Sequence, residues 1–372
     1  MSAIDGLFKT PPFTRKPAHR ALFIRALRDC AALQARRFPA LSRLYSRAGF
    51  RPESLRRESD VARLPFLFIS VFKEFDLRPV PPLRAALELT SSGTSGQKSR
   101  IRLDAGSLRR VVSSARSVYG ALGMVDPALK THYLCMTYDP RAAKDLGTAF
   151  TDELLTSFTA RGEVFYALRW DPRRRDFFFD LDGVISALRR MAATSLPLRV
   201  LGFPAHVRFA QEEWARRRLP PLHFGPKSWV LTGGGWKGRQ GAAITRTRFR
   251  ADISSWLGLP SSNLRDLYGL VEHGIPYVEC HLGRMHVPNY SRVLVRDPET
   301  LRILPPRAKG LLQLITPYLT SFPSFSVLTS DWGELKSRCS CGTPGQVLIL
   351  RGRAVKVAAK GCALSAVEHL AR

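Results

Sequence analysis

The chain has 372 residues, 45% of them hydrophobic, and a formal net charge of +28. This length is sufficient for a large core and predicts two or three structural units, and the composition is that of a folded globular protein. No apolar run reaches the roughly 20 residues of a membrane span, and the first residues lack a basic segment followed by an apolar one, so we expect a cytoplasmic protein.

The positive charge comes mostly from arginine. It favours anionic partners, namely nucleotides, nucleic acid, anionic lipid or an acidic protein. The arginines are spread along the chain, and their clusters are not interleaved with aromatic residues as on a base-stacking surface. Nucleic-acid binding is therefore an alternative hypothesis rather than the main one.

The N-terminal part is predicted to be helical. Apolar residues recur every three to four positions over residues 17–48, among arginines. Cys30 falls on the apolar side of this pattern, so we expect it in the core. Prolines at positions 65, 79, 81 and 82 then mark turns that lead into a loop rich in serine and glycine.

This loop, residues 91–99, reads SSGTSGQKS and offers backbone N–H groups, hydroxyls and one lysine to a phosphate group. Its glycines are three residues apart and Lys98 does not directly follow the second, so it is not a P-loop. Residues 101–103 alternate as a strand, and Asp104 is placed to cap a helix over 105–122. The predicted order is strand, phosphate-binding loop, strand, helix; a flexible surface loop is the alternative.

Strands and helices alternate from about residue 85 to 275, which predicts an α/β fold with a substantial sheet. The clearest elements are strands at 131–137 (with Cys135 in the core), 198–203 and 229–232, and helices at 184–193 and 205–218. The last strand runs into Gly233, Gly234 and Gly235, where a ligand would be able to approach the backbone closely. A tight turn is the alternative interpretation of these glycines.

After residue 285 the pattern changes to strands. Residues 292–296 and 301–304 flank a turn and predict a β-hairpin, and further strands are expected at 310–316 and 346–350. We therefore predict four segments, listed in chain order: an N-terminal helical region (1–84), an α/β core (85–284), a β-rich subdomain (285–350) and a short C-terminal tail (351–372).

Three short motifs follow the serine-rich loop. Residues 266–273, DLYGLVEH, put an aromatic ring, a glycine and a carboxylate on one predicted loop, which can stack a purine and hold a magnesium ion. Asp331 is predicted in a turn, where it would accept hydrogen bonds from sugar hydroxyls, and Arg353 in another turn. Each motif is weak alone.

In this order and spacing, the motifs resemble those of the adenylate-forming enzymes. Residues 68–73, 91–99, 233–237 and 361–365 are similar to LuxE-type acyl-protein synthetases, which are relatives of the phenylacetate–CoA ligases. The resemblance covers nearly the whole chain. It implies an adenylation domain of mixed sheets and helices, a β-rich C-terminal part and a truncated C-terminal domain. It also implies that ATP activates a carboxylic acid, which we expect to be a fatty acid, as an acyl-adenylate.

The resemblance implies roles for individual residues. The ATP phosphates would be clamped by Ser91, Ser92, Gly93, Thr94, Ser95, Gly96 and Lys98; Tyr268 and Gly269 would border the adenine and acyl sites, and Gly233, Gly234 and Gly235 would face adenine or substrate. Glu272 would coordinate magnesium, Asp331 would bind the ribose hydroxyls, and Arg353 would lie near the ribose or phosphate. Val271 and Gln97 depart from the superfamily pattern, which usually has threonine and proline there, so an adenylation-inactive homologue is an alternative.

The resemblance also singles out Cys362, because LuxE-type enzymes are acylated on a cysteine near the C-terminus. A thiolate accepts an acyl group and forms a thioester that remains reactive, and Lys360 and Arg353 are near enough in sequence to favour the thiolate. We expect the acyl group to pass to a partner reductase or an acidic acyl carrier protein. The alternative within the superfamily is a CoA ligase in which Cys362 is structural.

The remaining cysteines suggest a structural zinc site. Cys339 and Cys341 lie in a turn-rich segment, and Cys280 precedes His286 by six residues. Three thiolates and one imidazole make a closed tetrahedral zinc site, with His281 as an alternative fourth ligand and free thiols as the alternative state. A zinc-stabilised, basic nucleic-acid-binding protein without enzymatic activity is the competing hypothesis from another class.

Overall fold

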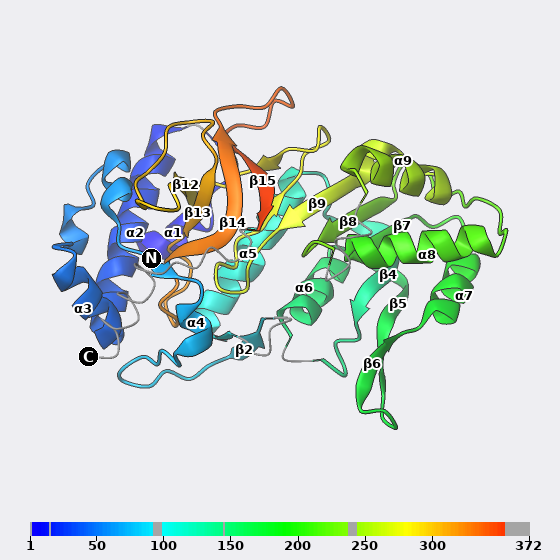
Figure 1. The fold of residues 1–372 in the computed structure, drawn as a ribbon, viewed down its shortest axis with the longest axis horizontal. Helices are drawn as coiled ribbons and strands as arrows, with labels where there is room; N and C mark the ends of the chain where they lie inside the picture. Colours follow the sequence, from blue (N-terminus) through cyan, green and yellow to red (C-terminus); the bar gives the residue numbers. More distant parts are fainter. Residues whose placement is uncertain (1, 15, 92–98, 144–145, 237–243, 354–372) are drawn as a thin grey trace. The chain divides into compact units, whose positions relative to one another are not determined.

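The computed structural model describes residues 2–14, 16–91, 99–143, 146–236 and 244–353. The chain divides into two compact units (Figure 1). Unit 1 comprises Met1–Ala121, Leu270–Tyr277 and Arg284–Arg372, and unit 2 comprises Leu122–Gly269 and Val278–Gly283. The predicted segments 1–84 and 285–350 fall in unit 1, and the predicted core, 85–284, contributes to both units.

Unit 2 is built on a sheet with the strand order β10-β9-β8-β7-β4-β5-β6. Its strands are β4 (Asp126–Tyr138), β5 (Thr159–Asp171), β6 (Asp176–Phe179), β7 (Leu198–Gly202), β8 (Trp229–Gly233), β9 (Leu264–Tyr268) and β10 (Tyr277–Val278, at the unit boundary). Strands β5, β4, β7, β8 and β9 are parallel, and only β6 is shown to pair antiparallel, with β5. The predicted strands at 131–137, 198–203 and 229–232 are confirmed as parts of this sheet.

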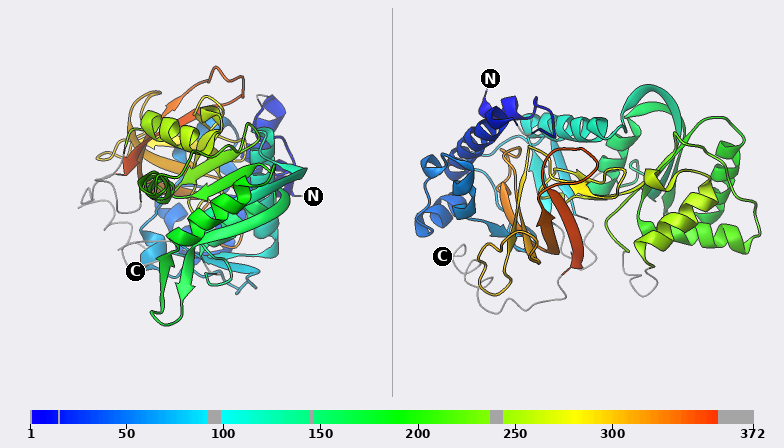
Figure 2. Two further views of the ribbon diagram at one scale, coloured as in Figure 1. Left: turned by 90° about the vertical axis from the view of Figure 1, so that its right-hand side faces the viewer. Right: turned by 90° about the horizontal axis from the view of Figure 1, so that it is seen from above.

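Helices cover both faces of this sheet. They are α6 (Gly147–Thr156), α7 (Leu181–Ala192), α8 (Pro204–Arg216) and α9 (Arg246–Leu257), with a short 3-10 turn, η4 (Ser261–Asn263). Buried residues of α7, α8 and α9 form one apolar cluster with Leu134, Val200, Val230 and Leu264 of the strands, and Figure 2 shows these helices on one side. On the other face, the Tyr133 hydroxyl donates to the Leu155 carbonyl of α6 at 3.4 Å.

Unit 1 contains a second sheet, with the order β11-β15-β14-β13-β12 and β1 paired in parallel to β14. The strands are β1 (Leu67–Phe68), β11 (Met285–His286), β12 (Arg292–Arg296), β13 (Gly310–Ile315), β14 (Ser326–Lys336) and β15 (Val347–Arg353). A separate hairpin joins β2 (Leu87–Thr90) to β3 (Arg100–Leu103). The predicted β-rich region is therefore confirmed in its strands at 310–316 and 346–350.

The predicted hairpin between 292–296 and 301–304 is wrong in its second strand. Strand β12 pairs with β13 along one edge, and residues 301–304 return beside its other edge. There they form an isolated bridge between Arg296 and Ile303 rather than a strand, with hydrogen bonds from Asp297 N to Arg302 O at 2.9 Å and from Leu304 N to Val295 O at 2.8 Å. Leu301 has a φ of 58°, and Pro305 and Pro306 follow, which have no N–H to donate to a ladder.

The helices of unit 1 lie mainly in its N-terminal part. They are α1 (Ala3–Leu7), α2 (Pro17–Arg37), α3 (Pro39–Arg47), α4 (Val71–Glu74) and α5 (Ala105–Ala121), with 3-10 turns η1 (Pro52–Ser54) and η2 (Glu58–Arg63). The predicted helical region 17–48 and the helix after Asp104 are confirmed, and Asp104 Oδ1 caps α5 by accepting from Ser107 N at 2.7 Å. No helix in the described ranges is both long and apolar enough to cross a lipid bilayer.

One irregular segment, residues 318–322 between β13 and β14, joins these helices. Its buried backbone carbonyls accept hydrogen bonds from side chains: Gln34 Nε2 donates to Leu319 O at 2.5 Å and to Phe322 O at 2.9 Å. Arg110 of α5 donates from Nε to Tyr318 O at 2.7 Å and from Nη2 to Thr320 Oγ1 at 2.8 Å. Buried carbonyls without partners would cost free energy, so these side chains hold α2 and α5 to the segment.

Replacing Arg110 by methionine should destabilise unit 1. The methionine fills similar volume but leaves Tyr318 O without its side-chain donor. It also removes the Arg110 hydrogen bond to Thr320 Oγ1 and the Arg110 ion pair with Asp5 at 2.7 Å. We expect the free energy of unfolding, measured by chemical denaturation, to fall by roughly 2–4 kcal/mol. Arg109→Met, at the exposed neighbouring position, is the matched control and should change it little; an equal loss in both variants would contradict this role.

Candidate functional site

The carboxyl ends of β8 and β9 bring two predicted motifs together in unit 2. The strands are parallel and adjacent, with Gly233 opposite Leu267. Gly233–Gly235 therefore leave the sheet beside Tyr268 and Gly269, at the edge where open parallel sheets bind ligands. Tyr268 lies at the end of a strand rather than on the predicted loop.

The glycines after β8 are required by the backbone. Gly234 and Gly235 have φ angles of 72° and 68°, which side-chain-bearing residues rarely adopt. At Gly233, a Cβ atom would meet Leu267 Cγ at 2.9 Å. The tight turn that the sequence left as an alternative is thus present, and it leaves the backbone at this edge without side chains.

Asp266 is a carboxylate of this edge that the sequence analysis gave no role. Its Oδ1 accepts from Thr232 Oγ1 of β8 at 3.3 Å, and burial raises its pKa to about 6, partly offset by Arg246 and Arg250. Its backbone N–H donates to Glu279 Oε2 at 2.8 Å. Arg246 and Arg250 also pair with Glu279, which is fully buried, so a charged network fixes the end of β9. This long-range pairing has no signature in the sequence.

Glu272 lies on the segment 270–277 of unit 1, just after the chain leaves unit 2. It is buried, and among the described residues no donor reaches its carboxylate, whereas Ser324 Oγ donates to its backbone carbonyl at 2.5 Å. Gly274, with a φ of 70°, has space only for hydrogen, because a Cβ would meet the Tyr318 hydroxyl at 2.2 Å. The turn that carries Glu272 is therefore packed onto segment 318–322.

A fully buried polar group lies next to Glu272. His273 Nε2 is 2.8 Å from the Tyr277 hydroxyl, which is 2.6 Å from Ser291 Oγ. The His273 and Tyr277 rings are stacked, with centroids 5.6 Å apart. Burial lowers the pKa of His273 to about 3, so the imidazole is neutral. These side chains fix the turn rather than face solvent, and the sequence analysis did not identify them.

Asp331 and Arg353, 22 residues apart, are cross-strand partners on β14 and β15. Arg353 Nε donates to Asp331 Oδ1 at 3.3 Å, and Asp331 is buried whereas Arg353 is exposed. Both residues lie in strands, so the predicted turns are wrong at these positions. The register of β14 shifts between Trp332 and Gly333, a bulge whose glycine gives the segment its turn-like sequence.

The serine-rich loop connects two strands, as predicted. Strands β2 and β3 pair antiparallel, and the pairing continues to Ser91, whose N–H donates to Ser99 O at 3.1 Å and whose Oγ accepts from Ser99 N at 3.0 Å. The side chain of Ser91 is therefore engaged in closing the loop. Ser92, Gly93, Thr94, Ser95, Gly96 and Lys98 lie outside the described residues, as does Cys362.

Three residues of the predicted zinc set come together in unit 1. The ligand atoms of His286, Cys339 and Cys341 lie within 4.8 Å of one another, and Cys341 Sγ is 3.2 Å from His286 Nε2. The fourth predicted residue, Cys280, is buried and precedes the return of the chain to unit 1 at Arg284 by four residues. Cys30 and Cys135 are buried in the cores as predicted, and burial raises the pKa of the Cys30 thiol to about 12.

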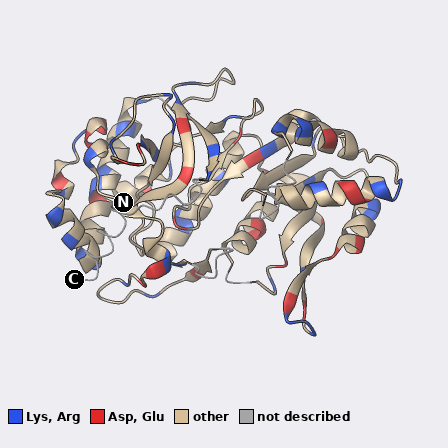
Figure 3. Ribbon diagram, in the orientation of Figure 1, with Lys and Arg blue, Asp and Glu red and all other residues tan. Residues whose placement is uncertain are grey.

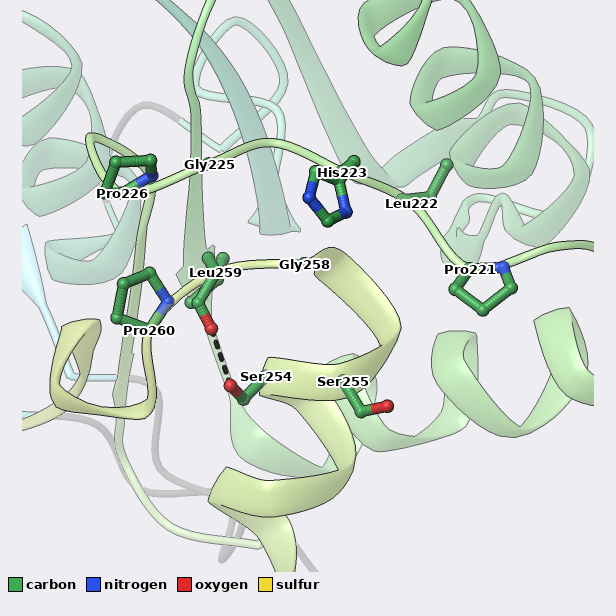
Figure 4. A pocket seen from close by; sticks show the side chains of 10 residues that line it. All are labelled: Pro221, Leu222, His223, Gly225, Pro226, Ser254, Ser255, Gly258, Leu259 and Pro260. Carbon is green, nitrogen blue, oxygen red and sulfur yellow. Dashed lines mark hydrogen bonds between the residues drawn. The ribbon is translucent and has the colours of Figure 1, made fainter.

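Unit 2 also has a pocket of about 530 Å³ at the opposite edge of its sheet (Figure 4). The lining residues come from two segments: residues 221–223, 225 and 226, which precede β8, and residues 254, 255 and 258–260, which precede β9. The five-residue strands β8 and β9 separate it from Gly233 and Tyr268 by roughly 15 Å. This pocket is therefore distinct from the candidate site at the carboxyl edge.

Comparisons with known proteins identify the family of this chain. Residues 51–371 match the family model described as acyl-protein synthetase, LuxE. The long-chain-fatty-acid–luciferin-component ligase of Aliivibrio fischeri is 26% identical over 314 residues, covering 82% of this chain and 78% of the relative. The Vibrio harveyi protein of the same name is 24% identical over 308 residues, with the same coverage.

Solved structures show the same fold. The open conformation of 2-hydroxyisobutyryl-CoA ligase, in complex with 2-HIB-AMP and CoA, superposes with a TM-score of 0.69 at 14% identity, covering 92% of this chain and 71% of the ligase. Its thioesterification state gives 0.70 at 15% identity, covering 92% and 69%. The predicted α/β fold of an adenylate-forming enzyme is thus confirmed. Since the family match spans most of its length, this chain belongs to the LuxE family of acyl-protein synthetases.

Proposed function

We propose that this protein uses ATP to activate a long-chain fatty acid as an acyl-adenylate and then transfers the acyl group to the thiol of Cys362. The observation that carries the proposal is the family match, because residues 51–371 contain every predicted site residue. The names of the two relatives, which are ligases of long-chain fatty acids, support the substrate class.

In the first step, a carboxylate oxygen of the acid attacks the α-phosphorus of ATP, and pyrophosphate leaves. Attack needs the two anionic groups held in line and their charge offset. Lys98 and the loop that includes Ser91 would hold the phosphates. The hairpin beneath this loop gives it a fixed base, because Ser91 and Ser99 close it and Ser321 Oγ accepts from Asp104 N at 3.0 Å just after β3.

Two groups of residues would hold the nucleoside: the Asp331–Arg353 pair, and the residues at the carboxyl ends of β8 and β9. Asp331 would accept hydrogen bonds from the ribose hydroxyls, and Arg353 beside it orients the carboxylate and leaves its own charge exposed to a phosphate. Tyr268, Gly269 and Gly233–Gly235 would border the adenine and the acid, since they share one sheet edge with a bare backbone.

Glu272 fits the magnesium role that the family resemblance implies. Glu272 is buried, and no donor among the described residues reaches its carboxylate, so its oxygens are available to a cation. A magnesium ion bound there would offset the charge of the ATP phosphates. The chain's own contribution is to fix Glu272, through Ser324 and the packed turn at Gly274.

In the second step, the Cys362 thiolate attacks the acyl carbonyl carbon, a thioester forms and AMP leaves. A thioester keeps the acyl group reactive for transfer to a further acceptor. We propose a reductase or an acidic acyl carrier protein as this acceptor, because the chain carries a net charge of +28 and would attract an acidic partner.

We further propose a structural zinc ion held by Cys280, His286, Cys339 and Cys341. Two thiols and an imidazole already lie within 4.8 Å of one another, and Cys280 is only six residues before His286 in sequence. A closed four-ligand site leaves no open position for chemistry. Its role would be to stabilise the strand β11 and the loop between β14 and β15.

Glu272→Gln should reduce adenylation strongly while the fold is kept. Glutamine preserves the shape but not the charge, so we expect pyrophosphate release with fatty acid and ATP to fall by roughly 10²–10³. The magnesium concentration for half-maximal nucleotide binding, followed by fluorescence, should rise. Glu299→Gln, an exposed carboxylate of the same unit, is the control; equal rates in both variants would exclude a role for Glu272.

Incubation with fatty acid and ATP should add one acyl group, by a hydroxylamine-sensitive bond, to the peptide containing Cys362. Intact-mass and peptide mass spectrometry detect it, and Cys362→Ser should lack it. If the protein releases pyrophosphate, makes acyl-CoA when CoA is added and is never acylated itself, it is a CoA ligase instead. If no acid in a panel gives pyrophosphate, adenylation itself is wrong.

The purified protein should contain about one zinc ion per chain, measured by elemental analysis. Cys341→Ser and Cys339→Ser should lose it and lower the melting temperature, whereas Cys362→Ser should keep it. Zinc-free protein in which the three thiols of the proposed site react freely, with a melting temperature that chelation leaves unchanged, would contradict the site.

A further inference from the structure

The helices α2 and α3 of unit 1 carry an unusual concentration of positive charge. Residues 16–51 contain nine lysine and arginine residues and one acidic residue, Asp29. In the whole chain the ratio is 58 to 30, so the excess here is well beyond the general composition. Figure 3 shows these basic residues in blue on α2 and α3.

Seven of these cations are exposed and form what we call the basic face. They are Lys16, Arg20, Arg25, Arg36, Arg43, Arg47 and Arg51. The other two are half-buried: Arg37 Nη1 donates to Thr320 O at 3.0 Å, and Arg28 lies 4.0 Å from Asp29. The seven exposed cations of the basic face are thus distinct from Arg28 and Arg37, whose side chains make contacts within unit 1.

The packing of α2 turns two cations of the basic face, Arg25 and Arg36, toward solvent. Cys30 and Gln34 contact the carbonyls of segment 318–322, at 3.7 Å and 2.5 Å. Arg25 and Arg36 fall on the opposite side of the helix, given its 3.6-residue turn. Because Gln34 anchors the buried side, α2 cannot rotate its cations into the unit without losing those hydrogen bonds.

The composition of the basic face favours electrostatic attraction to a negatively charged surface over a specific protein interface. Among the described residues, no carboxylate forms an ion pair with Arg20, Arg25, Arg36 or Arg43. The exposed large apolar side chains of the described part are Val80, Trp170, Phe178, Leu282 and Ile303, and none belongs to residues 16–51. Specific protein interfaces have a core of apolar and aromatic anchors, which this face lacks.

We propose that the basic face adsorbs the protein to the surface of a bilayer containing anionic lipids. Groups of four to eight lysines and arginines on a helical surface attract such headgroups, each cation adding to the affinity. Adsorption would be electrostatic, since the face has no apolar side chain to insert. The adsorption itself does not depend on the proposed function, but its benefit does. A long-chain acid dissolves poorly in water and partitions into bilayers, so an adsorbed enzyme would meet its substrate there.

The test uses the full-length protein and two variants that lose equal charge. In the first, Arg20, Arg25, Arg36 and Arg43 are replaced by glutamine. The matched control replaces four exposed arginines of unit 2, Arg173, Arg175, Arg189 and Arg218, which likewise have no ion pair to a described carboxylate. Co-sedimentation is measured with vesicles of phosphatidylcholine alone or mixed with phosphatidylglycerol, at low and high salt.

We expect salt-sensitive binding of the wild type to the mixed vesicles only, weakened at least about tenfold in the first variant and little in the control. The proposal is overturned if the wild type does not bind the mixed vesicles. It is also overturned if both variants lose vesicle binding equally, because net charge alone would then explain the binding. If the first variant still binds the mixed vesicles but no longer binds an acidic acyl carrier protein or RNA, the basic face belongs to that partner and the proposal is overturned. Pyrophosphate release from a short, soluble acid is recorded in parallel, so failure of the proposed function is detected separately.

Discussion

The backbone carbonyls of segment 318–322 are the constraint on which unit 1 depends. They are buried between β13 and β14 and belong to no sheet ladder, so side chains must supply their donors. Gln34 supplies them from α2 and Arg110 from α5. Helices that are remote in sequence are thereby fixed to the strand region by directed hydrogen bonds as well as by apolar packing.

The same segment supports two parts of the candidate site. Tyr318 lies against Gly274 and so limits the turn that carries Glu272, while Ser321 binds Asp104 where β3 ends. The base of the serine-rich loop and the proposed magnesium ligand thus share one rigid support. Adenylation needs orientation and fixed charge, and in the proposed function this segment would hold both parts of the site in place.

Local patterns predicted much of the fold. The periodicity of residues 17–48, the cap at Asp104 and the apolar runs of β4, β7 and β8 each reflect contacts within a few residues, and all are confirmed. Two local predictions were wrong. Asp331 resembled a turn residue because Gly333 forms a bulge, yet it lies in β14 and pairs with β15. Residues 301–304 resembled a strand, yet they make only an isolated bridge to β12, because Leu301 has a positive φ and two prolines follow.

The sequence by itself determined which chemical groups are available: the order of the motifs, the family they resemble and the cysteines and histidine of the proposed zinc site. Only the tertiary structure decided which of them meet. The Asp331–Arg353 pair, the Asp266–Thr232 contact and the burial of Glu272 each join or enclose residues through strand register and packing. These depend on hydrogen bonds between segments far apart in the chain, which no local pattern of residues encodes.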